Sequence, residues 1–91
     1  MIRIFVTYEA KPESDRLAEH IAVCRRIPGA TVRHGAIQRT LFGAPLEHYV
    51  EFEFADPDAW RSVSTSEEFA AAASDAAAMG IAHSVYVVEI D

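Results

Sequence analysis

The stretch HYVEFEFADP, residues 48–57, decides the fold, because it joins a β-strand directly to the start of a helix. Its side chains alternate between an apolar and a polar face: Val50, Phe52 and Phe54 against Tyr49, Glu51 and Glu53. Such alternation is typical of a strand with one buried face, here from His48 to Ala55. Asp56 can cap a helix, and Pro57 suits a first helical position, where no amide hydrogen is needed.

Patterns of the same kind on both sides of this stretch predict the remaining elements. We expect strands over Ile2–Tyr8, Thr31–Thr40 and His83–Ile90, a helix over Asp15–Arg26, and helical structure from Asp56 to Met79. The order strand, helix, strand, strand, helix, strand is that of the ferredoxin-like βαββαβ arrangement. The fold class is therefore α+β, an antiparallel sheet with its helices on one face.

Helix ends carry their own signals. Ser14 is available to cap the first helix, and Pro28-Gly29 follows its end. After a first helical turn behind Asp56, a capping box of Ser64 with Glu67, or of Thr65 with Glu68, starts the next helix. Gly80 ends it. Its predicted buried face holds Phe69, Ala72, Ala73, Ala76 and Met79, with Ser74 and Asp75 on the outer side.

Composition limits the class of protein. The chain has 91 residues, enough for a single domain over 1–91, and no apolar run of the roughly 20 residues that a membrane span needs. A net charge of −6 disfavours nucleic acid and anionic membranes as partners. The one cysteine cannot form an internal disulfide, so a disulfide scaffold is excluded. We expect a soluble, cytoplasmic domain.

Apolar residues on the polar face of the sheet predict a second covering layer. Phe5 lies on the minority face of the first strand, and the last strand is apolar on both faces, with Val85 and Val87 opposite Tyr86 and Val88. Two helices cover only one side of a sheet. The simplest cover is a second copy of the chain, packed sheet to sheet across a two-fold axis. The sequence therefore predicts a homodimer whose sheets enclose a cavity.

The best local constellation for chemistry is His20 with Cys24, one helical turn apart on the same side. Such a pair could bind a metal or form a thiolate–imidazolium couple. The alternative is structural, with Cys24 as a small core residue and His20 at the edge of the helix interface.

The polar face of the third strand is a second constellation. In an enclosed cavity the carboxyls of Glu51 and Glu53 could be desolvated and serve acid–base chemistry beside Tyr49. Alternatively Arg3 and Arg33 pair with them as a structural ion-pair ladder. Tyr8 and Tyr86 are expected to line a pocket or fill the core, and Trp60 to anchor a helix. The remaining histidines are expected to be solvated near strand ends: His34, His48 and His83.

The segment HIAVCRRIPG, residues 20–29, resembles the signature of the EthD-like family, a histidine followed nine residues on by glycine in a Leu/Ile-Pro-Gly turn. The aromatic strand Tyr49 to Phe54, the acidic turn Asp56 to Asp58, the Ser64 to Glu67 helix start and Asp75 are also similar to that family. Three features differ from the family. Ala22 and Val23 stand where the family often has His-x-Pro-Leu, Arg16 replaces an aromatic residue, and the loop between the second and third strands is shorter.

The resemblance implies a dimeric α+β barrel and a link to the breakdown of ethers and other organic compounds, with members often labelled oxidoreductase. His20 is the one candidate functional residue that it transfers. The sequence contains no binding motif for haem or flavin, and we expect no tightly bound cofactor and no metal.

A rival resemblance is to the RNA-recognition module, which has the same element order. Ile4-Phe5-Val6 and residues 48–54 resemble its two strand motifs, with Phe5 and Tyr49 at stacking positions. Pro45 and Leu46 stand where that module has a basic residue and glycine, and a net charge of −6 repels RNA. The sequence therefore favours the EthD-like interpretation.

Our hypothesis from the sequence is a cavity that binds a small apolar organic molecule and supports oxidoreductase or proton-transfer chemistry. His20 is the general acid/base, while Tyr8, Tyr49 and Glu51 orient the substrate, with Tyr86 also lining the pocket. A non-catalytic binding protein with the same cavity, and a purely structural interaction domain, are the alternatives.

Overall fold

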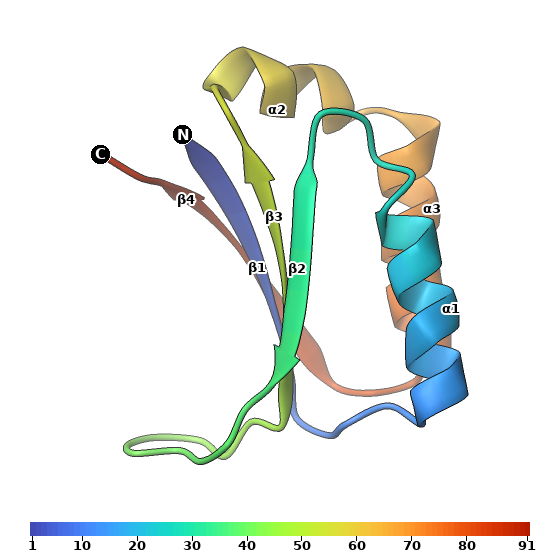
Figure 1. Cartoon of the computed structure of the whole chain (residues 1–91), viewed down its shortest axis with the longest axis vertical. Coiled ribbons are helices and arrows are strands. Elements are labelled where there is room, and N and C mark those ends of the chain that lie inside the picture. Colours follow the sequence, from blue (N-terminus) through green and yellow to red (C-terminus); the bar gives the residue numbers. More distant parts are fainter.

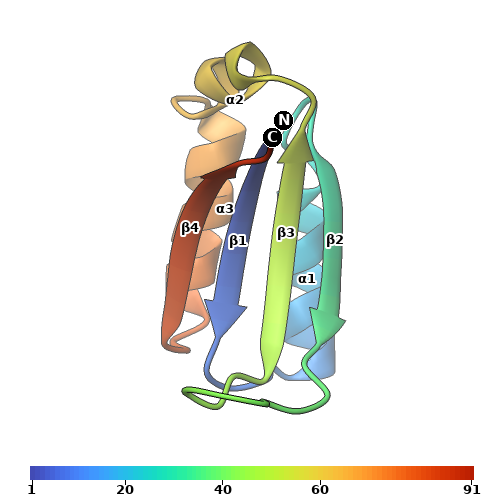
Figure 2. The ribbon, with the colours of Figure 1, turned by 90° about the vertical axis from the view of Figure 1, so that its left-hand side faces the viewer.

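Four strands form one antiparallel sheet in the order β2-β3-β1-β4, in a computed structural model that describes residues 1–91. The strands are β1 (Ile2–Tyr8), β2 (Thr31–Ala36), β3 (His48–Phe54) and β4 (His83–Glu89). Helices α1 (Ser14–Cys24) and α3 (Glu67–Ala78) pack side by side on one face (Figure 1). The short α2 (Pro57–Val63) follows β3, and the other face carries no helix (Figure 2). The ferredoxin-like α+β prediction is confirmed.

The register of the central strand fixes which side chains face the helices. Ile4 of β1 pairs with Phe52 of β3 and with Val87 of β4, and these three share the helix face. Phe5, the next residue, pairs with Glu51 and Tyr86 on the opposite face. We call this opposite surface the open face.

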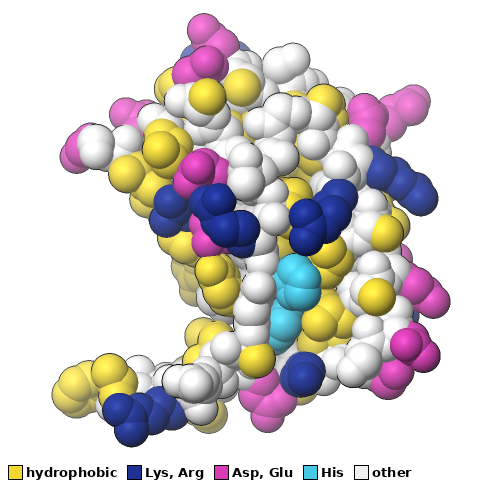
Figure 3. Space-filling model, viewed as in Figure 1, with side chains coloured by type: hydrophobic (Ala, Val, Ile, Leu, Met, Phe, Trp, Pro, Cys, Tyr) yellow, Lys and Arg dark blue, Asp and Glu magenta, His cyan; other side chains and the backbone are white.

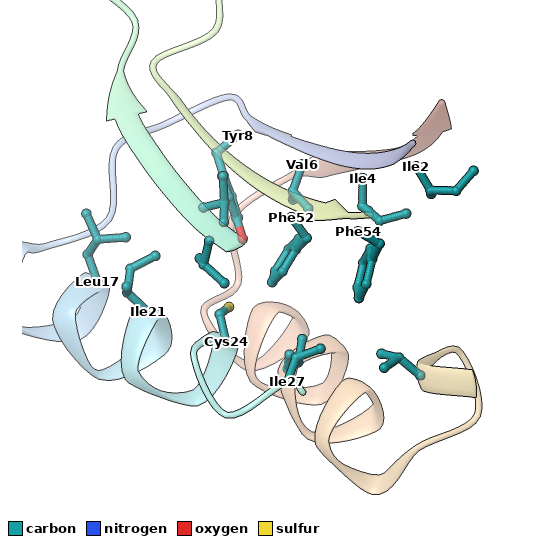
Figure 4. Close-up of a cluster of buried hydrophobic side chains, with 14 residues drawn as sticks. Ile2, Ile4, Val6, Tyr8, Leu17, Ile21, Cys24, Ile27, Phe52 and Phe54 are labelled. Atoms are coloured by element: carbon teal, nitrogen blue, oxygen red, sulfur yellow. The ribbon is translucent and has the colours of Figure 1, made fainter. Parts of the chain in front are cut away.

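The core lies between the sheet and the helices. Figure 4 shows side chains of β1 and β3 pointing toward α1 and the turn that follows it, with Ile2, Ile4, Val6 and Tyr8 in a row along β1. The largest fully buried side chains are Tyr8, Phe54, Ile4, Val50 and Cys24. Trp60 anchors α2, as expected, with its ring 5.6 Å from that of Phe54 and 5.2 Å from that of Phe69.

The second strand ends at Ala36, four residues before the predicted Thr40. The ladder continues for one bond only, in which the N–H of Ile37 donates to the carbonyl of Glu47 over 2.9 Å. The chain then turns at Gly43, whose φ of +90° suits a residue without Cβ. Residues 37–47 therefore form a loop.

Two helix starts differ from the prediction. Glu13, not Ser14, caps α1, because its carboxylate accepts the backbone N–H groups of Asp15 and Arg16. Ser66 caps α3 by accepting the N–H of Phe69, whereas Ser64 belongs to the end of α2 and donates its hydroxyl to the carbonyl of Arg61. Asp56 caps α2 as expected.

Strand β4 is apolar on both faces, as predicted, and both faces are largely uncovered. Val85 and Val87 are 53% and 55% exposed on the helix face, and Tyr86 is 54% exposed on the open face. None of the helices is both long enough and apolar enough to span a bilayer.

Candidate functional site

His20 is the centre of the candidate site. It shares the buried stripe of α1 with Leu17, Ile21 and Cys24 and is only 2% exposed. Its Nδ1 lies 2.8 Å from Oδ2 of Asp75 in α3. A carboxylate only accepts hydrogen bonds, so Nδ1 carries a proton and donates it to Asp75. In the neutral ring Nε2 is then a proton acceptor.

Asp75 is held in place by Arg16. The guanidinium makes a two-pronged contact, with Nη2 2.8 Å from Oδ1 and Nη1 3.1 Å from Oδ2. Hydrogen bonds from Arg16, and secondarily from His20, hold the pKa of Asp75 below its usual range, so this carboxyl stays ionised. The prediction that Asp75 lies on the outer side of its helix is wrong, because the residue faces α1.

Tyr8 and Cys24 face the other nitrogen of His20. The hydroxyl of Tyr8 lies 3.2 Å from Nε2, and Sγ of Cys24 lies 3.5 Å from it. Burial, first of all, raises the pKa of Tyr8 to about 12 and the pKa of Cys24 to about 12. Both groups therefore stay protonated near neutral pH. Within this cluster Nε2 of His20 is the proton acceptor, and Tyr8 is a hydrogen-bond donor.

A thiol in this state is expected to be inert. At a fixed pH, raising the pKa of Cys24 from 9.0 to about 12 lowers the thiolate fraction about 1000-fold, and only the thiolate is alkylated. We therefore expect iodoacetamide to label Cys24 only after unfolding, as followed by mass spectrometry. Stoichiometric labelling of the native protein within minutes would contradict this and restore the thiolate–imidazolium alternative.

A small cavity of about 90 Å³ lies against these groups, between the sheet and α3. Most of its walls are apolar, and they include Phe52, Phe69, Ala72 and Ala76. Its volume is about that of three water molecules in the liquid. The wall reaches the surface at Val85, on the edge strand. We call this space the His20 cavity.

The open face carries an ion-pair ladder. Arg3 and Arg33 each place an Nη2 near Oε2 of Glu53, at 2.8 and 2.9 Å. The same two arginines approach Glu51 through Nε at 3.1 and 3.5 Å, and Tyr49 donates its hydroxyl to Glu51 over 2.8 Å. Hydrogen bonding from Arg3, above all, lowers the pKa of Glu53. This arrangement supports the structural interpretation of the ladder.

The sheet separates the residues that we expected to form one site. His20 and Tyr8 meet on the helix face, whereas Tyr49, Glu51 and Tyr86 lie on the open face. Tyr49 pairs with Thr7, one position before Tyr8, so the two tyrosines must point to opposite sides. A single pocket in one chain holding all of these side chains is therefore ruled out.

Two residues of the site were not found by sequence reasoning. Arg16 precedes His20 by four positions and so shares its helix face. From the sequence alone it is only a difference from the EthD-like pattern, with no role assigned to it. Asp75 is the one acidic residue in the alanine-rich part of its helix, and no local signal says that it meets α1.

The prediction for His48 is wrong. We expected a solvated surface residue, but its side chain is buried beneath α1, at 2% exposure. His34 is exposed as expected, and His83 is partly buried with Nδ1 2.9 Å from the carbonyl of Ile81. No three His, Cys, Asp or Glu side chains are grouped so as to hold a metal ion.

Comparisons with known proteins agree on the fold. No family model and no curated protein matches the sequence. Among solved structures, an EthD family protein from Bacillus halodurans superposes with a TM-score of 0.80 and 18% identity over 100% of this chain and 99% of that one. A dimeric ferredoxin-like protein of unknown function from Jannaschia sp. gives 0.74 and 21%, over 98% of both chains.

A third structure, an antibiotic biosynthesis monooxygenase, gives a TM-score of 0.61 and 16% identity over 100% of this chain and 99% of that one. The three TM-scores establish a shared fold. The chain therefore has the ferredoxin-like α+β fold of an EthD family protein, in agreement with the resemblance carried by residues 20–29.

Proposed function

We propose that this chain is an EthD-like enzyme that moves a proton to or from a small, largely apolar organic molecule, with His20 as general acid/base. One observation carries the proposal. His20 lines an apolar cavity and its Nδ1 is fixed to a carboxylate, an arrangement that defines the tautomer and leaves Nε2 as the nitrogen that exchanges a proton.

Each neighbour of His20 has a role in this step. When Nε2 takes a proton from a bound molecule, the ionised Asp75 stabilises the imidazolium through Nδ1. Arg16 keeps Asp75 in position and ionised. Without a ligand, Tyr8 donates its hydroxyl to Nε2. A bound molecule takes the place of this hydrogen bond, and the hydroxyl, which remains protonated, then donates to the oxygen on which negative charge develops.

The names of two similar structures, an EthD family protein and a monooxygenase, support an oxidoreductase form of this proposal. Proton abstraction makes an organic molecule electron-rich, which prepares it for oxidation. The electron acceptor has to come from outside the cluster, because Tyr8, His20, Cys24 and Asp75 supply only proton transfer and hydrogen bonds.

We further propose that the protein is a homodimer with the two open faces packed together. The open face presents Phe5, Tyr86 and Val88 without a covering layer, and one of the similar structures is described as dimeric. In this assembly Tyr49, Glu51 and Tyr86 line the space between the sheets, on the other side of the sheet from His20.

A non-catalytic binding protein is the second candidate. The observation that favours it is the small size of the His20 cavity, with Tyr8 and Cys24 fully buried. A molecule bound stoichiometrically and recovered unchanged would support this alternative.

Replacing His20 with glutamine is expected to abolish proton transfer while keeping a polar side chain of similar reach. We would incubate the protein in D₂O with a panel of small ketones and measure deuterium incorporation next to the carbonyl by NMR. Loss of a general base lowers such rates by about 10²- to 10⁴-fold.

The exposed His34 gives the matched control, since His34→Gln removes an imidazole far from Asp75 and should leave the rate unchanged. Equal rates for wild type and His20→Gln would show that His20 is not the base.

A further inference from the structure

A second hollow lies on the other side of α1, between this helix and the edge strand β2. Its volume is about 540 Å³, and none of its lining residues borders the His20 cavity. The lining combines an apolar wall from α1 with basic and histidine side chains: Leu17, Ala18, Ile21, Ala22, Lys11, Arg25, His34 and His48. We call it the α1–β2 groove.

His48 sets this groove apart from an ordinary surface hollow. The side chain is buried, yet neither Nδ1 nor Nε2 has a hydrogen-bond partner. Buried polar atoms are nearly always paired with protein, water or ligand, so an imidazole with two free nitrogens needs an explanation. Its ring lies 5.6 Å from that of His34, which is exposed at the mouth of the groove.

The charged side chains that line the groove are all basic. The lining includes Lys11, Arg25 and two histidines but no Asp or Glu, in a chain whose net charge is −6. Figure 3 shows the histidine side chains in this hollow, with Lys or Arg side chains above and below them. The carboxylate of Glu47 lies beside the groove, where it accepts the backbone N–H of Lys11 over 2.7 Å.

The cations at the rim have free donors. Arg25 makes one contact, a long hydrogen bond of 3.5 Å from Nη1 to the carbonyl of Val32. Lys11 forms no side-chain ion pair. Burial, and then the charges of His34 and Lys11, lower the pKa of His48, so an anion placed beside these three residues would relieve the repulsion among them.

We propose that the α1–β2 groove is a binding site for a small amphipathic oxyanion, a carboxylate or phosphate attached to an apolar body. The oxyanion lies at His34 and His48 under the field of Lys11 and Arg25, and the apolar body lies along Leu17 and Ile21. The site is separate from the His20 cavity, and its occupancy does not depend on the activity of that site.

The test uses the full chain with ¹⁵N-labelled histidine at constant pH and low salt. Hexanoate, hexyl phosphate, inorganic phosphate and the neutral 1-hexanol are titrated while the ring nitrogen signals of all histidines are followed by NMR. We expect saturable shifts of His34 and His48 with hexanoate or hexyl phosphate, and none of His20. Tighter binding of hexanoate or of hexyl phosphate identifies the preferred headgroup. If inorganic phosphate also shifts these signals, the anion binds without an apolar body.

Variants check the assignment. Lys11→Gln and Arg25→Gln should each weaken binding about fivefold, while Arg26→Gln, outside the groove lining, should not. His34→Gln and His48→Phe should weaken binding further, and His34, being exposed, can be replaced without a folding defect. Equal shifts with 1-hexanol, identical affinities for Lys11→Gln and Arg26→Gln, or no shifts up to about 20 mM anion would each overturn the proposal.

Discussion

Replacing Asp75 with alanine is expected to lower the free energy of unfolding by about 2–3 kcal/mol. The substitution leaves Nδ1 of the buried His20 without an acceptor and releases the guanidinium of Arg16 from its two-pronged contact. Breaking a buried ion pair by removing one partner costs about 3–5 kcal/mol, and the side chain of Asp75 is a quarter exposed, so a smaller figure applies. Urea denaturation followed by circular dichroism gives the value.

The chain contains a matched control for this experiment. Asp58 also pairs with an arginine, Arg61, over 2.7 Å, but both side chains are largely exposed. Exposed pairs contribute little, so Asp58→Ala should be hard to separate from wild type. Similar losses for the two variants would show that the contacts of Asp75 with Arg16 and His20 do not stabilise the fold.

The stabilisation from Asp75 should also depend on pH with a definite sign. Its pKa in the folded chain lies below the usual value of about 4, because Arg16 and His20 favour the ionised form. The contribution is therefore complete above pH 4 and is lost as the pH falls through the folded pKa. The stability difference between wild type and Asp75→Asn should shrink as the pH falls below about 4. A difference that grows as the pH falls below about 4 would contradict this assignment.

The sheet could be predicted from sequence because its signals are local. Alternation of Val50, Phe52 and Phe54 with polar neighbours requires only that one face is buried, and Asp56-Pro57 specifies a helix start without help from distant residues. The length of β2 could not be obtained in this way. Its end depends on where the ladder with β3 stops, and that is a property of two segments together.

The same distinction between local patterns and contacts across elements applies to the candidate site. His20, Cys24 and Tyr8 follow from helix spacing and strand parity, and the structure brings them together. Asp75 belongs to another helix, and its meeting with His20 is set by how α1 packs on α3, which no pattern within either helix encodes. His48 looked like a solvated strand end because its burial is produced by α1, which lies far from it in sequence.

Tyr86→Asp is expected to convert the proposed homodimer into a monomer, and this prediction tests the assembly most directly. Tyr86 stands beside Phe5 on the open face, where the second sheet would cover it. A carboxylate buried there without a partner costs several kcal/mol, which weakens the dimer at least 100-fold. Light scattering on a sizing column, over a range of concentrations, should then give 10.0 kDa for the variant and twice that for wild type.

Val87→Asp is the matched control, since Val87 lies on the same strand with nearly the same exposure, 55% against 54%, but on the helix face. If the open faces pack together, only the Tyr86 variant dissociates, because Val87 stays outside the interface. Dissociation by both variants would place the contact at the edge of β4 instead, and a monomeric wild type would remove the dimer altogether. Because Tyr8 and His20 lie within one chain, a monomer would keep the His20 cavity and lose only the space lined by Tyr49, Glu51 and Tyr86.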